Sequence, residues 1–562
     1  MVQRLPATDV VIVGLGAAGG VASGVLTAAG LKVVGLEAGD YNTVNDYLAE
    51  YDELEGFYFK NTLGEAKVNH EVPTWRPNPS SPNQPLASPW RMANGVGGSS
   101  VHWTGQSWRY REDDFLIRTS TVERYGMQAL PTGSTVVDWP ITYQELEPYY
   151  EQVEHQIGVA GAGGTNPFES PRAADYPMPP LRQVGALEWA YEAMSAAGYH
   201  PFPSPAAITS VDYEGRPACS YCGYCTGFGC WNDSKSSSLV TTIRAAEATG
   251  NLEIRTRARV TQILTDDQGR ATGVVYVDAE GSEIEQPASA VIVSTYVYEN
   301  NRLLMLSTSD SHPDGIGNST GQLGKHYSAH AYVGAYGVFP GRNFNVGSGT
   351  GAQSVAMDDF NGDNFDHSDL GFIRGAVVNF SMAESAPIAL SRNVAPGRPQ
   401  WGSAYKRYLK EDVGSVFSFF GQLEVLTYED NFLDLDPDAV DQYGIPRIRV
   451  TFELKDNELA AGTFLSEKLE ALARDAGATD TWSTGAMLIP VNSHAYGGTR
   501  MGTDPATSVT NRYGQVHDVP NLLVLGGSNF PSITGYNPTE TIYAHSWYAA
   551  EHLANTIGAI GR

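Results

Sequence analysis

The chain is short of cysteine. Only four cysteines occur among 562 residues, and all of them lie between Cys219 and Cys230. Thiols confined to one window cannot link distant parts of a chain, which argues against a disulfide-stabilised secreted protein. No apolar run reaches the roughly 18 to 20 residues that a membrane-spanning helix needs, and the N-terminus shows no export signal. Export on the signal of a partner stays open.

Basic residues are also scarce. The sequence has 36 Lys and Arg against 63 Asp and Glu, a formal net charge of −27. Nucleic acids and anionic membrane surfaces bind positively charged surfaces, so both are disfavoured as direct partners. The length and the hydrophobic content of 42% suffice for more than one domain with a buried core.

The four cysteines form one run, ACSYCGYCTGFGCWN, with two, two and four residues between them. Intervening glycines allow the backbone to fold tightly, so the thiolates can converge on one soft metal ion or cluster. Runs of similar density hold iron–sulfur clusters. A structural zinc site or two local disulfides are the alternatives, and the spacing alone leaves all three open.

The first forty residues have the pattern of a nucleotide-binding unit. An apolar strand at 9–13 is followed by a glycine loop, a helix-compatible stretch to Ala29, a second strand at 32–36 and Glu37. In such a unit the glycines allow the turn, the approach of the pyrophosphate and helix packing, while the acid accepts from ribose hydroxyls. The order of these parts predicts a dinucleotide site at Gly14, Gly16, Gly19 and Glu37.

Two further segments favour FAD over NAD. Residues 94–105, NGVGGSSVHWTG, form a glycine-rich loop with hydroxyls, an imidazole and an indole. In the block 492–548 a strand at 521–525 leads into Gly526-Gly527-Ser528, and a helix opens near Asn537-Pro538-Thr539, where proline suits the first helical position.

The middle of the chain reads as strands and connections. Residues 251–280 alternate as a hairpin with a turn at 266–269, a strand follows at 288–294, and a helix at 299–306. Runs at 375–383, 415–427 and 447–454 are expected to be strands of one antiparallel sheet, and the Pro-, Asn- and Gly-rich stretches 40–90 and 160–215 to be lids and connections.

The motifs VGLGAAGG, GVGGSSVHWTGQSWR, ERYG, the cysteine run and GYNPT resemble the glucose–methanol–choline (GMC) oxidoreductases, which oxidise alcohols and sugars with FAD. The closer resemblance, over nearly the whole chain, is to the large flavoprotein subunits of gluconate 2-dehydrogenases. It implies an α/β fold, with a Rossmann-like FAD-binding domain and an α+β substrate domain built on an antiparallel sheet. The implied FAD-binding domain comprises 1–50, 85–125, 205–315 and 490–562, the cysteine run included; 51–84, 126–204 and 316–489 form the substrate-binding domain, lids and connections.

The resemblance assigns a catalytic pair, His494 and Asn537. An imidazole of near-neutral pKa can take the hydroxyl proton while hydride passes to flavin N5, and an amide can orient the alkoxide. The helix near Thr539 would direct N–H groups toward the flavin pyrimidine, and His545 is expected to pack or lie near FAD. The implied cofactor-binding residues, besides those of the N-terminal unit, are Gly97, Gly98, Ser99, His102, Thr104, Val260 near the adenine, Gly527, Ser528, Asn537, Pro538 and Thr539.

The string VGGSSVHWT resembles the pyranose oxidase loop in which a histidine is joined to the flavin 8α-methyl group. We therefore expect His102 to carry FAD covalently, with noncovalent stacking as the alternative and Thr104 near flavin N5. The chain departs from most relatives, which have a small residue and Asn where Val101 and His102 stand. Many also have an acid where Gly527 stands, and the backbone N–H groups there can take its place.

With FAD present, the cysteine run has a use, because a reduced flavin holds two electrons that a nearby cluster can release singly. We expect a [3Fe–4S] or [4Fe–4S] cluster bound by Cys219, Cys222, Cys225 and Cys230. The predicted function is oxidation of a secondary hydroxyl of a sugar acid, sugar or polyol. Electrons would pass through a small companion subunit to cytochrome c or a quinone, at the periplasmic face of the membrane by resemblance, or in the cytoplasm if the chain acts alone.

Two other functions are weighed against this one. A pyranose-type oxidase would use oxygen and keep the cysteines structural, and a nucleotide-binding subunit with a zinc site would have no use for the His494–Asn537 pair. Among substrates, gluconate requires a cation near the site, for which Arg109, Arg392 and Arg500 are candidates.

Overall fold

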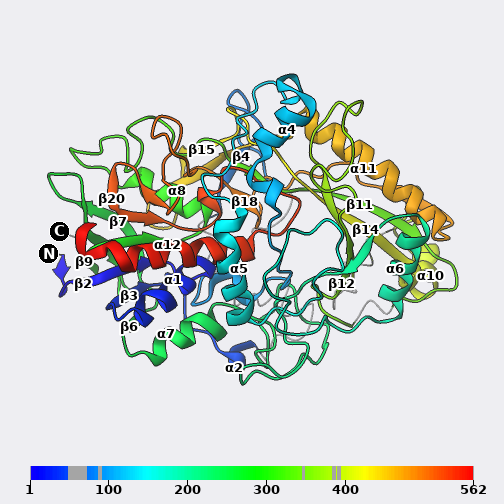
Figure 1. The fold of residues 1–562 in the computed structure, drawn as a ribbon, viewed down its shortest axis with the longest axis horizontal. Coiled ribbons are helices and arrows are strands. Elements are labelled where there is room, and N and C mark those ends of the chain that lie inside the picture. The colour runs from blue at the N-terminus through cyan, green and yellow to red at the C-terminus, as the bar shows by residue number, and fades with distance from the viewer. Residues whose placement is uncertain are drawn as a thin grey trace.

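The computed structural model describes residues 2–47, 72–86, 92–344, 348–382 and 394–560, together with Ile388 and Ser391. The described residues form sheets of nine, six, three and two strands. Figure 1 shows the nine-stranded sheet at one end of the elongated molecule, near both chain termini, and the six-stranded sheet at the other. Residues 48–71 and 87–91 of the predicted lid lie outside the described residues.

The centre of the nine-stranded sheet is parallel, as in dinucleotide-binding folds. Its order β19-β20-β9-β2-β3-β6 places β2 (Thr8–Val13) between β9 (Glu283–Val293) and β3 (Val33–Leu36). These strands are almost continuous apolar runs because both of their faces are covered. The other strands of this order are β6 (Leu252–Arg255), β19 (Gln515–Val516) and β20 (Val519–Val524).

Two layers cover the faces of this sheet. α1 (Ala17–Ala28) and α12 (Thr539–Ile560) lie side by side on one face (Figure 1), and their apolar side chains pack against β2 and β9. The hairpin of β7 (Arg259–Thr265) and β8 (Ala271–Val277) covers the other face together with α8 (Val297–Leu306). The predicted hairpin, strand and helix of the middle region are therefore confirmed, with small shifts of their ends.

The six-stranded sheet is antiparallel, with the order β17-β11-β14-β13-β12-β5. β11 (Ala331–Val338) pairs with β14 (Val416–Leu423) over its whole length, and α11 (Asp456–Asp475) packs on both (Figure 1). The other strands are β5 (Pro201–Pro203), β12 (Ser354–Met357), β13 (Ala376–Ser381) and β17 (Asp480–Ser483).

The run 447–454 does not join this sheet. It forms β16 (Pro446–Thr451), which pairs with β15 (Phe432–Val440) and β4 (Thr74–Arg76) in a separate three-stranded sheet. Alternation predicts a strand but not its partners, which depend on contacts distant in sequence. The remaining elements are β1 (Gln3–Arg4), β10 (Ser328–Ala329), β18 (Ala495–Tyr496), α2 (Val44–Tyr47), α4 (Ile117–Tyr125), α5 (Tyr143–Ile157), α6 (Gly185–Ala196), α7 (Arg244–Ala248) and α10 (Gly402–Glu411).

The predicted fold class is confirmed: an α/β unit with a parallel central sheet is joined to an antiparallel sheet with a packed helix. The exact division into domains stays a prediction. α12 begins at Thr539, and the carbonyl of Pro538 accepts from Ile542 N at 2.9 Å, so Pro538 precedes the helix rather than opening it. No helix in the described part of the chain is long and apolar enough to cross a membrane.

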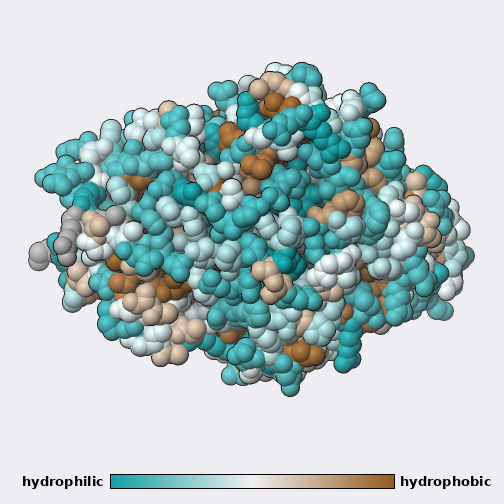
Figure 2. All heavy atoms as spheres, in the orientation of Figure 1, coloured by the Kyte–Doolittle hydropathy of each residue, from teal (hydrophilic) through white to brown (hydrophobic). Residues whose placement is uncertain are grey.

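The surface is mostly polar on the face seen in Figure 2, where apolar residues form small separate groups. This agrees with the excess of acidic residues in the sequence. A large apolar patch, which would mark an extensive contact surface, is not seen on this face.

A buried ion network connects the segment 112–115 with the six-stranded sheet. Arg374, just before β13, donates from Nη2 to Asp114 Oδ1 at 2.6 Å and from Nε to Glu424 Oε2 at 2.8 Å. Arg111 Nη2 donates to the same Asp114 oxygen at 3.0 Å. Arg374 and both carboxylates are buried. Because charges removed from water need partners, this network fastens the two parts of the protein.

Replacing Arg374 by Met is expected to lower the free energy of unfolding by about 3–5 kcal/mol, because buried Glu424 loses its arginine and buried Asp114 keeps only Arg111. The control is Arg398→Met. Arg398 pairs with Asp480 at 2.5 Å at the surface, with side chains 41% and 47% exposed, and its loss should cost about 0–1 kcal/mol. Denaturant unfolding measures both variants, and equal losses would contradict the structural role of the network.

Candidate active site

A large cavity opens at the carboxyl ends of the parallel strands, where open α/β sheets bind their ligands. It encloses about 1830 Å³, its open mouth included. Gly14 follows β2, Glu37 follows β3, Ser294 follows β9 and Gly526 follows β20, and all four residues line it. We call this space the central cavity.

The N-terminal glycine loop forms one wall of the central cavity. Gly14 has φ +87°, and a Cβ there would lie 2.8 Å from Ser294 O. A Cβ on Gly19 would lie 2.0 Å from Gly14 O, so α1 packs on its strand only with glycine at this position. Gly16 differs: the nearest atom to a Cβ there is Gly98 Cα at 3.9 Å, because Gly16 faces the cavity. Conversely, a Cβ on Gly98 would lie 2.8 Å from Gly16 Cα, so the two glycine loops meet through their backbones.

The Glu37 carboxylate joins three loops at the cavity. Oε2 accepts from Leu15 N at 3.0 Å, and Oε1 accepts from Gly39 N at 3.0 Å and Gly95 N at 3.1 Å. Charge-assisted hydrogen bonds of this kind are stronger than neutral ones. The sequence predicts Glu37 as a ribose acceptor; in the structure its carboxylate also binds the backbones of both glycine loops.

The predicted catalytic residues His494 and Asn537 lie next to each other in the lining of the central cavity. Asn537 Nδ2 lies 3.3 Å from His494 Nε2, and both residues line the central cavity. His494 Nδ1 lies 3.0 Å from Nδ1 of His330, which is fully buried behind it. Removal from water lowers the pKa of His494 to about 4. The imidazole is therefore neutral at physiological pH and can accept a proton.

The central cavity fits FAD. Gly16 is the N-cap of α1 without a side-chain cap, and Ala17 and Ala18 line the cavity, so free helix N–H groups can receive the pyrophosphate. Pro538 and Thr539 bring the start of α12 to the same space. Asn537 Oδ1 is buried and has no hydrogen-bond partner among the described residues, so it can accept from a bound molecule.

The loop that contains His102 lies against the cysteine run. His102, Trp103 and Thr104 line the central cavity, as do Thr226 and Gly227 of the run. Gly227 N donates to His102 O at 2.7 Å. Lys235 Nζ adds bonds to the carbonyls of Trp103 at 2.9 Å and Cys225 at 2.6 Å. The cysteine run therefore lies next to the loop that is predicted to bind the flavin, and hydrogen bonds to backbone carbonyls hold the two together.

The four cysteines differ in exposure and form no disulfide. Cys225 is buried, Cys222 is exposed, and Cys219 and Cys230 are intermediate. Within the described ranges no three His, Cys, Asp or Glu side chains are placed to hold a metal ion. Burial raises the pKa of Cys219 to about 11, which favours a thiol rather than a thiolate ligand. This arrangement does not fit an iron–sulfur cluster unless the loop moves.

Most residues predicted to bind the cofactor line the central cavity. Three lie behind the lining: Gly19, Gly97 and Ser528, whose Oγ accepts from Asn300 Nδ2 at 2.9 Å. Those that line it are Gly14, Gly16, Glu37, Gly98, Ser99, His102, Thr104, Val260, Gly527, Asn537, Pro538 and Thr539. His545 lies outside the lining, with Nε2 3.0 Å from Arg512 O.

Sequence reasoning missed other residues of the site. Ser294 and Tyr296 line the central cavity. Ser294 was within reach of prediction, because it ends an expected strand at the same sheet edge as Gly14. His330 carries no local signal, since its contact with His494 spans 164 positions of the sequence.

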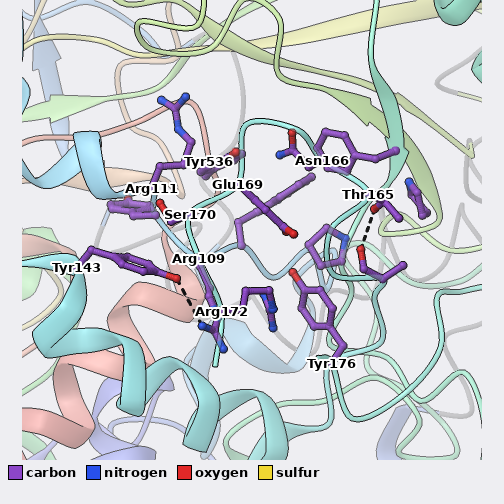
Figure 3. Close-up of a pocket in the computed structure, with 16 residues that line it drawn as sticks. Arg109, Arg111, Tyr143, Thr165, Asn166, Glu169, Ser170, Arg172, Tyr176 and Tyr536 are labelled. Atoms are coloured by element: carbon purple, nitrogen blue, oxygen red, sulfur yellow. Dashed lines mark hydrogen bonds between the residues drawn. The ribbon is translucent and has the colours of Figure 1, made fainter. Parts of the chain in front are cut away.

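None of the candidate cations is placed beside His494 in the described structure. Arg109 lies in a separate small pocket with Tyr143, Arg172 and Tyr536 (Figure 3) and donates to Glu154 at 2.8 and 2.7 Å. Arg500 donates to the carbonyls of Thr135 and Thr507 at 3.0 and 2.7 Å. Arg392 lies outside the described residues.

Comparison with known proteins agrees with this site. Two models of the GMC oxidoreductase family match residues 190–331 and 427–546. The gluconate 2-dehydrogenase flavoprotein of Pantoea cypripedii is 32% identical over 98% of this chain and 94% of its own. The 2-methyl-1,2-propanediol dehydrogenase of Mycolicibacterium austroafricanum is 32% identical over 98% of this chain and 96% of its own. The fructose dehydrogenase large subunit of Gluconobacter japonicus is 26% identical over 98% of each chain.

A solved structure shows the same fold. Formate oxidase of Aspergillus oryzae superposes with a TM-score of 0.63 at 17% identity, over 99% of this chain and 98% of its own. The relatives in sequence, the family models and the cavity for FAD point to one conclusion. The chain belongs to the GMC oxidoreductases and is an FAD-dependent enzyme that acts on CH–OH groups.

Proposed function

We propose that this protein is a dehydrogenase that oxidises a secondary hydroxyl of a sugar, polyol or sugar acid. The observation that carries the proposal is the neutral, half-buried His494, whose Nε2 lies in the cavity lining 3.3 Å from Asn537 Nδ2. FAD, when bound, supplies the acceptor for the hydride of the alcohol carbon. Its pyrophosphate would be held at Gly14–Gly16 and the N-terminus of α1, and its ring system between His102 and Asn537.

The residues of this chain handle the proton and the orientation of the alcohol. His494 Nε2 takes the hydroxyl proton, since an unprotonated imidazole is an efficient general base near neutral pH. The Asn537 side chain orients the same oxygen without competing for the proton. Asn537 is buried and His494 is half-buried, which limits the access of water and strengthens both interactions.

The lining favours an uncharged substrate. Among the described residues that line the central cavity, the only Lys or Arg is Arg259. Its neighbour Ala258 donates its backbone N–H to Glu37 O at 2.9 Å, which places this segment beside Glu37. Glu37 is at the nucleotide end of the site, away from the His494–Asn537 pair that we assign to the chemistry. Among the described residues, a carboxylate beside His494 would therefore lack a cation. The relatives include enzymes named for a diol and for fructose as well as one named for gluconate, so this preference rests on the lining alone.

The electron acceptor is proposed from the relatives. Three relatives over nearly the full chain are named dehydrogenases, and one of these is a large subunit. We therefore propose a companion subunit with a cytochrome or quinone as acceptor. An oxidase is the second candidate, because paromamine 6′-oxidase of Streptomyces fradiae is 27% identical over 98% of this chain.

Substrate reduction of bound FAD tests the function. Anaerobic mixing with sugars, diols and polyols is expected to bleach the flavin absorbance, and a quinone or ferricenium should restore it faster than oxygen. Hydrogen peroxide formed in step with substrate consumption would select the oxidase instead. If no sugar, polyol or sugar acid bleaches the flavin, the proposed function is wrong.

His494→Gln is expected to slow flavin reduction by about 10²–10⁴-fold, because the general base is lost. In the unchanged protein the rate should stay flat from pH 6 to 8 and fall only as His494 becomes protonated, near its pKa of about 4. The control is His200→Gln at a surface histidine whose side chain is 57% exposed. Stopped-flow absorbance measures these rates, and a His494→Gln rate within twofold of the unchanged protein would contradict the role.

Covalent attachment of FAD at His102 stays a prediction, supported by the position of His102 in the cavity lining. After a denaturing gel, the protein band should fluoresce, and His102→Ala should abolish this fluorescence. Trp103→Phe is the control, because it changes the neighbouring side chain and keeps the imidazole. Quantitative release of flavin by acid precipitation of the unchanged protein would show noncovalent binding.

An iron–sulfur cluster of the [3Fe–4S] or [4Fe–4S] type likewise stays a prediction, and no reaction step is assigned to it. Metal sites often assemble only with their metal, because binding supplies the free energy that gathers the ligands. We expect iron and sulfide after anaerobic reconstitution, with a broad visible shoulder that Cys225→Ser removes and Ser220→Ala keeps. Elemental analysis checks this, and absence of iron would leave the cysteines structural.

A further inference from the structure

Two histidines from distant parts of the chain are brought together behind the central cavity. β10 and β18 pair antiparallel, with Ser328 opposite Tyr496 and Ala329 opposite Ala495. Continuing this register by one residue places His330 opposite His494. Their Nδ1 atoms lie 3.0 Å apart, a hydrogen-bond distance. A hydrogen bond between two nitrogens requires one proton between them, so the donor must be identified.

The contact on the far side of His330 shows which of its two ring nitrogens carries the proton. His330 Nε2 lies 2.6 Å from the carbonyl oxygen of Thr534, which can only accept. His330 is fully buried, and removal from water together with the neighbouring His494 holds its pKa well below the ordinary value. The neutral ring carries one proton, which is therefore on Nε2. His330 Nδ1 is left as an acceptor, and His494 Nδ1 must be the donor.

The contact on the cavity side of His494 fits this tautomer. Asn537 Nδ2 lies 3.3 Å from His494 Nε2 and can donate to it when that nitrogen carries a lone pair. Asn492 holds both histidines in place: Nδ2 donates to His330 O at 2.8 Å, and Oδ1 accepts from His494 N at 2.8 Å. Tyr332 OH, 3.4 Å from both Asn492 Oδ1 and His494 Nδ1, completes the enclosure.

We propose that His330 is a positioning residue: by accepting from His494 Nδ1, it holds His494 in the tautomer whose Nε2 lone pair faces the substrate. The inference rests on the proposed function, in which His494 is the general base. Without an acceptor at position 330, His494 can instead carry its proton on Nε2, where it cannot take one from an alcohol. The chain from Thr534 O through His330 also gives the protonated His494 a partner in its dry surroundings.

A first experiment reads the tautomer without any turnover. Protein labelled with ¹⁵N in its histidine rings is studied by NMR, and the signals of His494 are identified by their loss in His494→Asn. The expected pattern is a protonated Nδ1 and an unprotonated Nε2 in the unchanged protein, and a mixture of tautomers in His330→Leu. A protonated Nε2 in the unchanged protein would overturn the inference, whatever the substrate proves to be.

A second experiment tests whether His330 acts through His494. His330→Leu removes the acceptor and is expected to slow flavin reduction 10- to 100-fold with KM unchanged. His330→Asn keeps an acceptor near the Nδ1 position and should recover most of the rate. In a His494→Asn background, His330→Leu should have no further effect, because residues that act as one unit are not additive. If His330→Leu does not retain FAD, His330→Ala takes its place in the same cycle.

The outcomes separate the inference from the function. Reduction of the flavin by substrate in the unchanged protein supports the proposed function but does not test the role of His330. If the flavin is not reduced, the proposed function is wrong, and the NMR experiment still shows which tautomer His494 adopts. The inference is overturned if His330→Leu stays within twofold of the unchanged rate. It is also overturned if that substitution slows the His494→Asn protein by the same factor, which is the result expected of a residue that only maintains the fold.

Discussion

The architecture of the site depends on one carboxylate. Glu37, at the end of β3, accepts from backbone N–H groups of the N-terminal glycine loop, of its own strand end and of the second glycine loop. These bonds hold two loops that are far apart in sequence close enough for Gly16 and Gly98 to meet without side chains. The wall that receives the nucleotide is therefore built from backbone, held by a single buried acid.

The chemical end of the cavity follows a different rule. There, removal from water rather than charge sets the properties of the groups, because the partners of His494 are neutral: His330 between β10 and β11, Tyr332 in β11 and Asn492 in the C-terminal block. Removal from water keeps the imidazole unprotonated, so that its Nε2 lone pair is available to accept the hydroxyl proton. The buried ion networks, by contrast, fasten segments to one another, as Arg374 and Arg109 do.

Prediction from the sequence succeeded where function depends on local backbone geometry. Gly14 and Glu37 lie within 24 positions of one another, and strand, turn and helix propensities are enough to bring them to one sheet edge. It failed where side chains meet across long separations. Arg109 is neutralised by Glu154, 45 positions away, and no local motif marks that pairing. The cluster at the four cysteines stays a prediction, since no three possible ligands surround one point among the described residues.

The sequence by itself determined the nucleotide-binding unit, since a short motif carries it and the backbone imposes its geometry locally. It also carried the resemblance that indicates the family and implies the pair His494–Asn537. Only the tertiary structure decided what stands behind that pair. His330 faces His494 because β10 and β18 pair in one register, and a register is chosen by the packing of the whole core rather than by either strand. The direction of the hydrogen bonds, and with it the atom able to take a proton, follows from that packing.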